Sequence, residues 1–259
     1  MSANIIAVAN QKGGVGKTTT TVNLAASLAA RNKRVLVIDL DPQGNATTGS
    51  GVDKTAIRHG VYHVLLGEAD VKTAVDTGGS GGYHVLAANR ALAGAEVELV
   101  QEIAREVRLK NALKAVESDY DFILIDCPPS LGLVTLNVMV AADEVMIPIQ
   151  AEYYALEGLS QLWNTVERIG VDLNPGLRVS GMLLTMADKR TKLSEEVESE
   201  VRSHFPDHTF ETVIPRSVRI SEAPSYGQTV VTYDPRNVGA IAYRKAALEL
   251  CQRVAASEE

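Results

Sequence analysis

The segment Lys12–Thr20, with the sequence KGGVGKTTT, constrains the fold of this chain more than any other part of it. It follows an apolar run at residues 5–9, and a helical pattern of apolar residues occupies positions 22–29. A glycine-rich loop between a buried strand and a helix is the arrangement that phosphate-binding α/β domains use. The segment therefore predicts a strand, a loop and a helix in direct succession.

The residues of this loop have the chemistry needed to hold a polyphosphate. Its glycines let backbone N–H groups point inward, and the N-terminus of the following helix adds the positive end of its dipole. Lys17 can reach the β- and γ-phosphates, and the Thr18 hydroxyl can bind Mg²⁺. We expect ATP or ADP as the nucleotide and Mg²⁺ as the metal. The expected nucleotide contacts in the loop are Gly13, Gly14, Val15, Gly16, Lys17 and Thr18.

The entrance of the loop departs from the common G-x-x-x-x-G-K-[ST] pattern. Gln11 stands where the first glycine would be, and Lys12 follows it. Lys17 already serves the terminal phosphates. A second lysine at the entrance of the loop is badly placed to fold back onto the nucleotide of its own subunit. It is well placed to reach a nucleotide on another subunit, and we interpret Lys12 in this way. The alternative is a lysine that is merely solvated.

Acidic residues end two of the apolar runs. Residues 121–126 form a continuous apolar run that ends in Asp126, the pattern of a buried central strand that delivers a carboxylate to the edge of a sheet. We expect Asp126 to hold Mg²⁺ opposite Thr18, often through a water; the alternative is a cap on the following turn. Asp39 ends the predicted strand at 34–39 and Asp41 lies just beyond it, so both fall at the edge of the sheet where ligands bind in such folds.

The alternation of short β-rich runs with helical patterns predicts an α/β fold of the P-loop NTPase type. Its sheet should be mostly parallel and twisted, with helices on both faces. Strands are predicted at 4–9, 34–39, 83–87, 121–126, 144–149, 179–186, 210–214 and 229–232. Helices are predicted at 17–31, 93–117, 131–141, 155–171, 192–204 and 239–256. One domain over residues 1–259 is expected, since α/β domains commonly reach this length.

Composition limits the environment and the partners of the chain. The net charge of −7 argues against a general affinity for nucleic acid, so DNA binding would require a local patch or one assembled at a dimer edge. Cys127 and Cys251 provide neither a metal-binding spacing nor a disulfide framework. The chain enters a strand at once and has no apolar stretch near the ~20 residues of a membrane span. We expect a cytoplasmic protein that does not bind membranes.

The glycine-rich loop resembles the deviant Walker A box of the ParA/Soj/MinD superfamily of ATPases. Residues 39–47 are similar to the second box of that superfamily, and residues 121–130 to its Walker B and switch segment. Residues 150–158 and 214–225 resemble chromosomal ParA (Soj) in particular. The resemblance covers about residues 4–250.

This resemblance implies a slow, Mg²⁺-dependent ATPase that works as a switch. ATP would hold two subunits face to face, with Lys12 of one subunit on the triphosphate of the other, as an arginine finger supplied in trans does. Asp41 would position or activate the attacking water, and Thr19 would contact the α-phosphate. Asp39 would serve Mg²⁺ indirectly or tie down the loop. The implied catalytic residues are Lys12, Lys17, Asp41 and Asp126, and the implied adenine contacts are Pro215 and Ser217.

The resemblance also implies macromolecular partners. Arg190 and Arg219, with Arg216 as a weaker candidate, are selected for non-specific binding of double-stranded DNA; ordinary solvated charges are the alternative. The ATP-bound form would be a homodimer associated with the nucleoid. A centromere-binding protein of the ParB (Spo0J) type would stimulate hydrolysis and release the dimer. Pro128, Pro129 and Gly132 would form the switch that senses the γ-phosphate.

Two other functions stay open at this stage. A MinD-like ATPase that positions the division site at a membrane needs a C-terminal amphipathic helix with basic and bulky apolar residues. Here the chain ends in Ser257-Glu258-Glu259, and its C-terminal part lacks Phe and Trp. A metabolic synthetase or an iron–sulfur ATPase is the other alternative. The latter needs thiolate ligands at a dimer interface, which Cys127 and Cys251 do not fit well.

Overall fold

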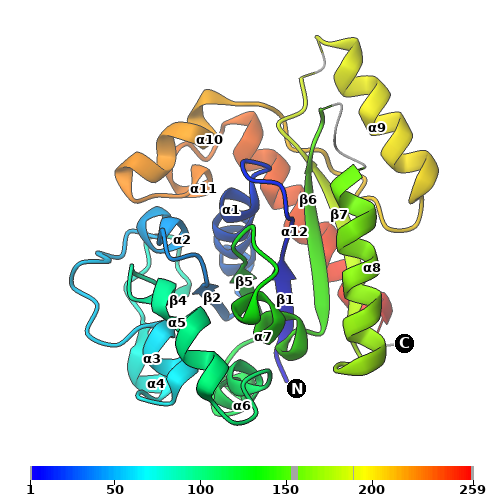
Figure 1. Cartoon of the computed structure of the whole chain (residues 1–259). Helices are drawn as coiled ribbons and strands as arrows, with labels where there is room; N and C mark the ends of the chain where they lie inside the picture. Colours follow the sequence, from blue (N-terminus) through cyan, green and yellow to red (C-terminus); the bar gives the residue numbers. More distant parts are fainter. Residues whose placement is uncertain (1, 153–156, 189, 258–259) are drawn as a thin grey trace.

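A computed structural model describes residues 2–152, 157–188 and 190–257 (Figure 1). Its centre is a seven-stranded sheet in the order β3-β4-β2-β5-β1-β6-β7. The strands are β1 (Asn4–Val8), β2 (Val35–Asp39), β3 (Val75–Asp76), β4 (His84–Leu86), β5 (Phe122–Asp126), β6 (Glu144–Gln150) and β7 (Arg178–Thr185). Neighbouring strands run parallel, except that the short β3 pairs antiparallel with β4. The predicted mostly parallel sheet is confirmed.

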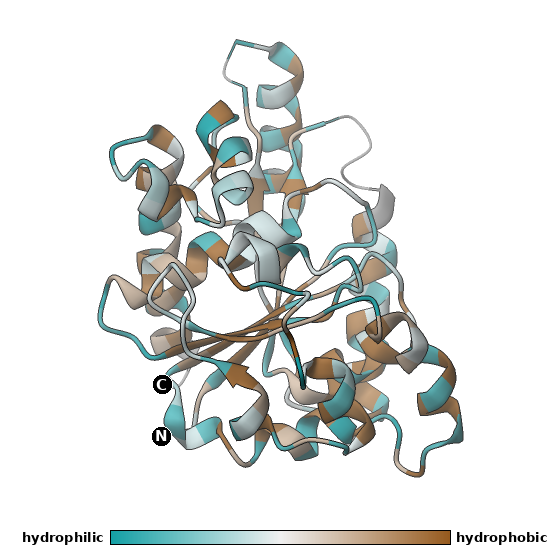
Figure 2. Cartoon of the chain, turned by 90° about the vertical axis from the view of Figure 1, so that its left-hand side faces the viewer, coloured by the Kyte–Doolittle hydropathy of each residue, from teal (hydrophilic) through white to brown (hydrophobic). Residues whose placement is uncertain are grey.

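Helices cover both faces of this sheet, and the strands form a hydrophobic layer between them (Figure 2). On one face, α1 (Lys17–Ala29) packs against α12 (Val238–Ser257). The other face is covered by α7 (Leu133–Ala141) and α8 (Glu157–Asp172) together with shorter helices. Besides α1, α7, α8 and α12, the described residues form α2 (Asn45–Gly49), α3 (Val61–Leu66), α4 (Val71–Ala74), α5 (Leu92–Glu98), α6 (Arg108–Leu113), α9 (Lys192–His204), α10 (Val218–Glu222) and α11 (Val230–Tyr233).

The alternation of side chains along the strands divides the core into two layers. Ile5 and Ala7 of β1 join the cluster that includes residues of α7 and α8, whereas Ile6 joins the cluster that includes residues of α1 and α12. Since both faces are buried, the strands read as continuous apolar runs in the sequence. No helix in the described part of the chain is long and apolar enough to cross a bilayer.

The predicted strand at 229–232 is wrong, because this segment forms α11. The side chain of Thr229 caps the helix by accepting a hydrogen bond from the backbone N–H of Thr232. The N–H of Val230 donates to Asn23 Oδ1 in α1 at 2.8 Å. A local cap and a contact with α1 therefore satisfy the backbone groups that a strand would have offered to the sheet.

The predicted strand at 210–214 is also not formed, although the segment runs beside β7. Phe210 and Ile214 donate their N–H groups to Met182 and Leu184, respectively. Between them, the N–H groups of Glu211 and Thr212 donate to the Glu249 carboxylate on α12. Because a side chain takes these donors, the ladder is interrupted and only isolated bridges remain.

The single helix predicted at 93–117 is wrong as well. The structure has α5, a 3₁₀ turn at Leu99–Gln101, α6 and a second 3₁₀ turn at Glu117–Asp119. Asn137 of α7 accepts from the N–H of Leu109 and donates to the carbonyl of Arg105, which holds the intervening loop open. The predicted helices at 17–31, 131–141, 155–171, 192–204 and 239–256 agree with α1, α7, α8, α9 and α12 to within a few residues, although residues 155 and 156 lie outside the described residues.

Candidate nucleotide-binding site

The glycine-rich loop connects β1 to α1 at the carboxyl edge of the sheet. Gly14 and Gly16 have φ values of +77° and +89°, a backbone region that favours glycine. No described side chain caps the N-terminus of α1, and its first turn contains no acidic residue. Its leading N–H groups are therefore available to an anion, and added Cβ atoms at Gly13 and Gly14 would meet open space. This geometry fits a phosphate cradle.

Two side chains outside the loop, Asn10 and Thr185, fix its backbone. Asn10 donates to the carbonyl of Pro148 at 2.8 Å and accepts from the N–H of Lys12 at 3.0 Å. Thr185, which ends β7, donates its hydroxyl to the carbonyl of Val15 at 2.8 Å. A loop that turns its N–H groups inward turns carbonyl groups outward, and these need donors. Thr185 is a contact that the sequence analysis missed, because it lies far from the loop along the chain.

Lys17 lies at the start of α1 and is largely buried, with 8% of the residue exposed. Its Nζ donates to the carbonyl of Lys12 at 3.2 Å, across the mouth of the loop. Burial lowers the pKa of Lys17, and the nearby Asp126 carboxylate opposes that shift. The side chain is therefore held at the loop, where the sequence predicts contact with the terminal phosphates.

Asp126 and Asp39 lie side by side, because β5 and β2 are paired in register at these two residues. Both are fully buried, and burial raises the pKa of each carboxyl. Thr18 donates its hydroxyl to Asp126 Oδ2 at 2.7 Å. A hydroxyl and carboxylates beside a phosphate cradle are the donors that Mg²⁺ prefers, and a cation would stabilise the charged carboxylates. The donor set fits the expected metal.

Asp39 makes the contacts that tie down the following segment. Its Oδ2 accepts from both the N–H and the hydroxyl of Thr47, at 2.7 and 2.8 Å. Its Oδ1 accepts from the N–H of Asp41 at 3.1 Å. Asp41 itself is partly exposed and accepts from the N–H of Gln43 at 2.9 Å. Its charge lies close enough to Lys17 to oppose the lowering of the Lys17 pKa by burial. Asp39 therefore places Asp41 at the site through the backbone.

The ammonium group of Lys12 lies beside Glu152 and is partly exposed. Its Nζ lies 3.8 Å from a carboxylate oxygen of Glu152, and both side chains are substantially exposed, at 38% and 50%. The backbone of Lys12, by contrast, is held on both sides by Asn10 and Lys17. Thus its main chain belongs to the cradle while its ammonium group faces the surface.

The residues selected for adenine lie on the segment between α9 and α10. Pro215 forms an isolated bridge with Ala187, which brings this segment beside the end of β7. Ser217 donates its hydroxyl to Asn237 Oδ1 at 3.0 Å. Asn237 also accepts from the N–H of Gly239 and so organises the start of α12. The contact of Pro215 and Ser217 with a base stays a prediction, and Asn237 is a neighbour that sequence analysis missed.

The arginines selected for DNA binding each lie beside acidic side chains. Arg190 makes two hydrogen bonds with Asp188, at 2.8 and 2.6 Å, and lowers the pKa of that carboxyl; Arg216 also lies near Asp188. Arg219 donates to Glu222 at 2.9 Å and lies over the ring of Tyr233. The structure therefore brings Arg190 and Arg216 to one carboxylate and places Arg219 in a separate cluster on α10.

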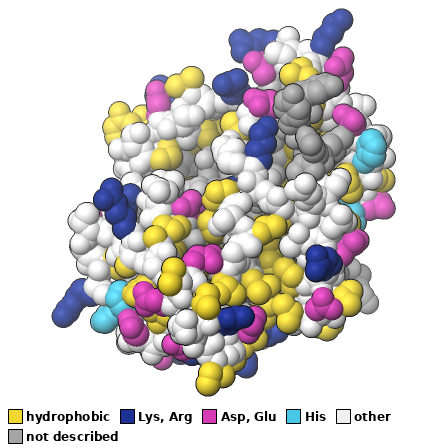
Figure 3. Space-filling view, viewed as in Figure 1, with side chains coloured by type: hydrophobic (Ala, Val, Ile, Leu, Met, Phe, Trp, Pro, Cys, Tyr) yellow, Lys and Arg dark blue, Asp and Glu magenta, His cyan; other side chains and the backbone are white. Residues whose placement is uncertain are grey.

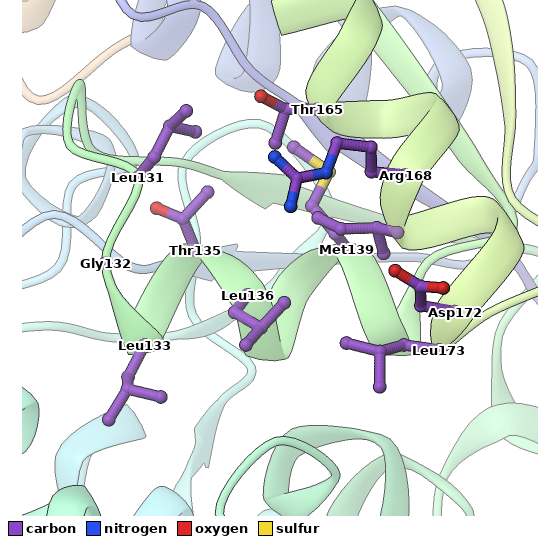
Figure 4. Close-up of a pocket in the computed structure, with 11 residues that line it drawn as sticks. Leu131, Gly132, Leu133, Thr135, Leu136, Met139, Thr165, Arg168, Asp172 and Leu173 are labelled. Carbon is purple, nitrogen blue, oxygen red and sulfur yellow. The ribbon is translucent and has the colours of Figure 1, made fainter.

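A cavity of about 490 Å³ lies between α7 and α8 (Figure 4). It is lined by Leu131, Gly132, Leu133, Thr135, Leu136, Met139, Thr165, Arg168, Ile169, Asp172 and Leu173. Hydrophobic side chains gather on one face of the molecule (Figure 3), and two of the residues that line the cavity, Leu131 and Leu173, are themselves exposed. The cavity adjoins the segment that follows Asp126, because Gly132 of that segment is one of its lining residues.

The parallel sheet, the glycine-rich loop and the acids beyond β2 and β5 define a P-loop nucleotide-binding protein. A family model described as an AAA domain matches residues 3–179. The chain is 54% identical over 253 residues to the sporulation initiation inhibitor protein Soj of Bacillus subtilis, covering 98% of each protein. It is 50% identical over 258 residues to the chromosome partitioning protein ParA of Caulobacter vibrioides, covering 98% of this chain and 97% of that protein.

Solved structures agree with this assignment at the level of the fold. A structure of cobyrinic acid a,c-diamide synthase from Mycobacterium smegmatis with bound ADP and magnesium matches with a TM-score of 0.87 and 37% identity over 98% of this chain and 96% of the other. The cell division ATPase MinD of Pyrococcus furiosus matches with a TM-score of 0.79 and 28% identity over 96% of this chain and 99% of the other. The chain belongs to the ParA/Soj family of chromosome-partitioning ATPases, and its site is consistent with ATP or ADP and Mg²⁺ as ligands.

Replacing Thr185 by Val should weaken nucleotide binding, because the carbonyl of Val15 loses its donor and the loop loses an anchor. A buried carbonyl left unpaired costs about 1–3 kcal/mol, so the affinity for ADP should fall by roughly five- to a hundredfold. Thr185→Ser keeps the hydroxyl and is the matched control. Isothermal calorimetry with ADP and Mg²⁺ measures the effect, and equal affinities of the Val and Ser variants would contradict this role.

Proposed function

We propose that this chain is an ATP-dependent dimerising switch of a DNA segregation system. In this proposal, ATP and Mg²⁺ join two copies face to face, and the dimer binds double-stranded DNA without sequence preference. A ParB (Spo0J)-like partner stimulates hydrolysis, after which the subunits separate and leave the DNA. The similarity to chromosome-partitioning proteins over nearly the whole chain supports this function. The MinD-like alternative receives less support, because the match to MinD has lower identity.

The chain's own groups divide the work of phosphoryl transfer. The N–H groups of the glycine-rich loop and Lys17 bind the phosphates and neutralise their charge. Thr18 and Asp126 would hold Mg²⁺, which supplies further charge neutralisation when bound. Asp41, placed by the Asp39–Asp41 contact, orients the attacking water. Orientation is the main task, since a carboxylate beside a triphosphate is a weak base.

The observation that supports the proposed dimer is the exposed ammonium group of Lys12. Its ammonium group faces Glu152 at 3.8 Å and remains substantially exposed, while its main chain lines the cradle. An ion pair this long between exposed groups contributes little and breaks easily. Little free energy is therefore lost when the lysine leaves Glu152 to neutralise a triphosphate held by a second copy.

Lys12→Ala should separate nucleotide binding from dimerisation. We expect ATP binding to be retained, because Lys17 and the loop are intact, while the ATP-dependent dimer is lost and kcat falls by about a hundredfold or more. Gel filtration with a non-hydrolysable ATP analogue and Mg²⁺ measures the dimer. Lys33→Ala, which removes an exposed lysine before β2 at the opposite edge of the sheet, is the control. A normal dimer with Lys12→Ala sinks the proposal.

Asp41→Ala should have the opposite effect on the dimer. Without the carboxylate that orients water, hydrolysis should fall by about a hundredfold while ATP still joins the subunits, so an ATP-bound dimer accumulates. Phosphate release and gel filtration with ATP report the two effects. Asp53→Ala removes an exposed carboxylate from the following loop and is the control. Unchanged turnover in Asp41→Ala would remove this residue from the mechanism.

Arg219→Ala should weaken DNA binding without changing ATP binding. Loss of one phosphate contact should lower affinity at every sequence and reduce the salt slope by about one. The ion pairs of Arg219 with Glu222 and Asp234 must be exchanged for contacts with DNA, so the effect at physiological salt should be modest. Arg34→Ala, which removes an exposed arginine paired with Asp121, is the matched control. Equal DNA affinity of the two variants over a salt series places the patch elsewhere.

A further inference from the structure

The helix that follows the Asp126 strand is attached to a segment of the chain that the proposed mechanism does not use. α7 begins shortly after Asp126, and the segment 92–113, which contains α5 and α6, lies against it. Asn137, fully buried in α7, donates to the carbonyl of Arg105 and accepts from the N–H of Leu109. This contact fixes the middle of α7. Its beginning is fixed by a different residue of the same segment.

Glu96 of α5 caps the N-terminus of α7 from outside. Its Oε2 accepts from the N–H of Leu133 at 2.9 Å, and its Oε1 accepts from the N–H of Val134 at 3.3 Å. The first N–H groups of a helix have no partner within the helix, and a negative charge there also interacts favourably with the helix dipole. A carboxylate that accepts backbone N–H groups makes charge-assisted bonds. Glu96, which is distant in sequence, thus accepts the hydrogen bonds that a local N-cap residue usually accepts.

Gly132 leaves the space that this carboxylate occupies. An added Cβ at Gly132 would overlap the carboxylate of Glu96. The backbone of Gly132, with φ −90° and ψ −167°, is one that other residues adopt, so its conformation does not require glycine. The reason for glycine here is the close approach of Glu96.

A cavity also adjoins the start of α7. Leu131, Gly132 and Thr135 line the cavity between α7 and α8, with Arg168 of α8 across from them (Figure 4). Side chains beside a cavity have few packing partners on that side. The contacts with Glu96 therefore contribute to the position of the first turn of α7, together with the burial of Val134 in the core.

The start of α7 is connected directly to the nucleotide site. Residues 127–131 join Asp126, which accepts from Thr18, to the capped turn of α7. Thr135 reaches back from α7 and donates to the carbonyl of Ser130 at 2.6 Å. A shift of the first turn of α7 would therefore move the connecting loop, while the strand end at Asp126 stays fixed in the sheet.

We propose that Glu96 is a positioning residue for ATP hydrolysis. By capping α7 through the gap at Gly132, it sets the conformation of residues 127–131 at the edge of the nucleotide site. This inference rests on the proposed ATPase mechanism and adds to it a residue from α5 that touches neither the nucleotide nor the expected metal ligands. Loss of the cap should affect the rate of the reaction more than the binding of ATP.

Hydrogen exchange tests the cap without any nucleotide. In Glu96→Ala, the amides of Leu133 and Val134 lose their acceptor, and exchange in a peptide covering this turn should rise about tenfold, the size expected for loss of a helix cap. Gly132→Ala keeps Glu96 but displaces its carboxylate, so it should have the same effect. The double variant should exchange no faster than either single variant, because both changes remove one interaction.

Two further variants control for other effects of the substitutions. Glu98→Ala removes a neighbouring carboxylate of α5 that accepts from the Tyr62 hydroxyl, and it should leave exchange in α7 unchanged. Glu96→Gln keeps an acceptor oxygen but not the charge, so exchange should be intermediate. If Glu96→Ala fails to fold, as judged by circular dichroism, Glu96→Gln still decides the question through exchange and kcat together.

Steady-state ATP hydrolysis tests the positioning role. Glu96→Ala should lower kcat about tenfold and change KM for ATP less than twofold, since a small misplacement near the reacting groups slows the reaction while the phosphate cradle is intact. Unchanged exchange in Glu96→Ala overturns the cap. Faster exchange with wild-type kcat shows a purely structural residue and also overturns the proposal. If the wild-type protein hydrolyses no ATP, the proposed function fails, whereas the exchange result still shows whether Glu96 caps α7.

Discussion

The structure depends on the burial of two carboxylates side by side at the carboxyl edge of the sheet. Asp39 and Asp126 are held in register by the pairing of β2 with β5, and burial raises the pKa of both carboxyls. Charges in such surroundings need donors or cations. Thr47, the N–H of Asp41, Thr18 and the nearby Lys17 surround the pair with donors and positive charge. The need to balance this charge brings the loops that follow β1, β2 and β5 together.

Each of these loops is then anchored by side chains, some close by in the sequence and some far along the chain. Asn10 and Thr185 hold the glycine-rich loop, Asp39 holds the segment that carries Asp41, and Glu96 holds the helix that follows Asp126. The anchors are hydrogen bonds to backbone groups, which fix the main chain and leave the reactive side chains free. The exposed side chain of Lys12 fits this plan, since its main chain is fixed while its ammonium group is available to another copy.

The parts that sequence analysis predicted correctly are those with local causes. The glycine-rich loop, β5 and α1 follow from patterns within a few residues, and the structure places Lys17, Thr18 and Asp126 together as predicted. The failures share a different cause. The segment 229–232 has a β-rich composition, but its N–H groups bond to Thr229 and to Asn23 of α1. The segment 93–117 reads as one helix, but Asn137 interrupts it. In each segment a side chain distant in sequence, Asn23 or Asn137, took over backbone groups, and in the first a local cap by Thr229 added to this effect.

The sequence by itself determined the alternation of strands and helices, the phosphate-binding loop and the acids that end β2 and β5. These features depend on residue types at short spacings, which act through local backbone geometry and hydrophobic periodicity. Only the tertiary structure decided which side chains support them: Thr185 beneath the loop and Glu96 at α7. Such contacts join residues from separate elements, and their existence depends on how those elements pack, which no local pattern specifies.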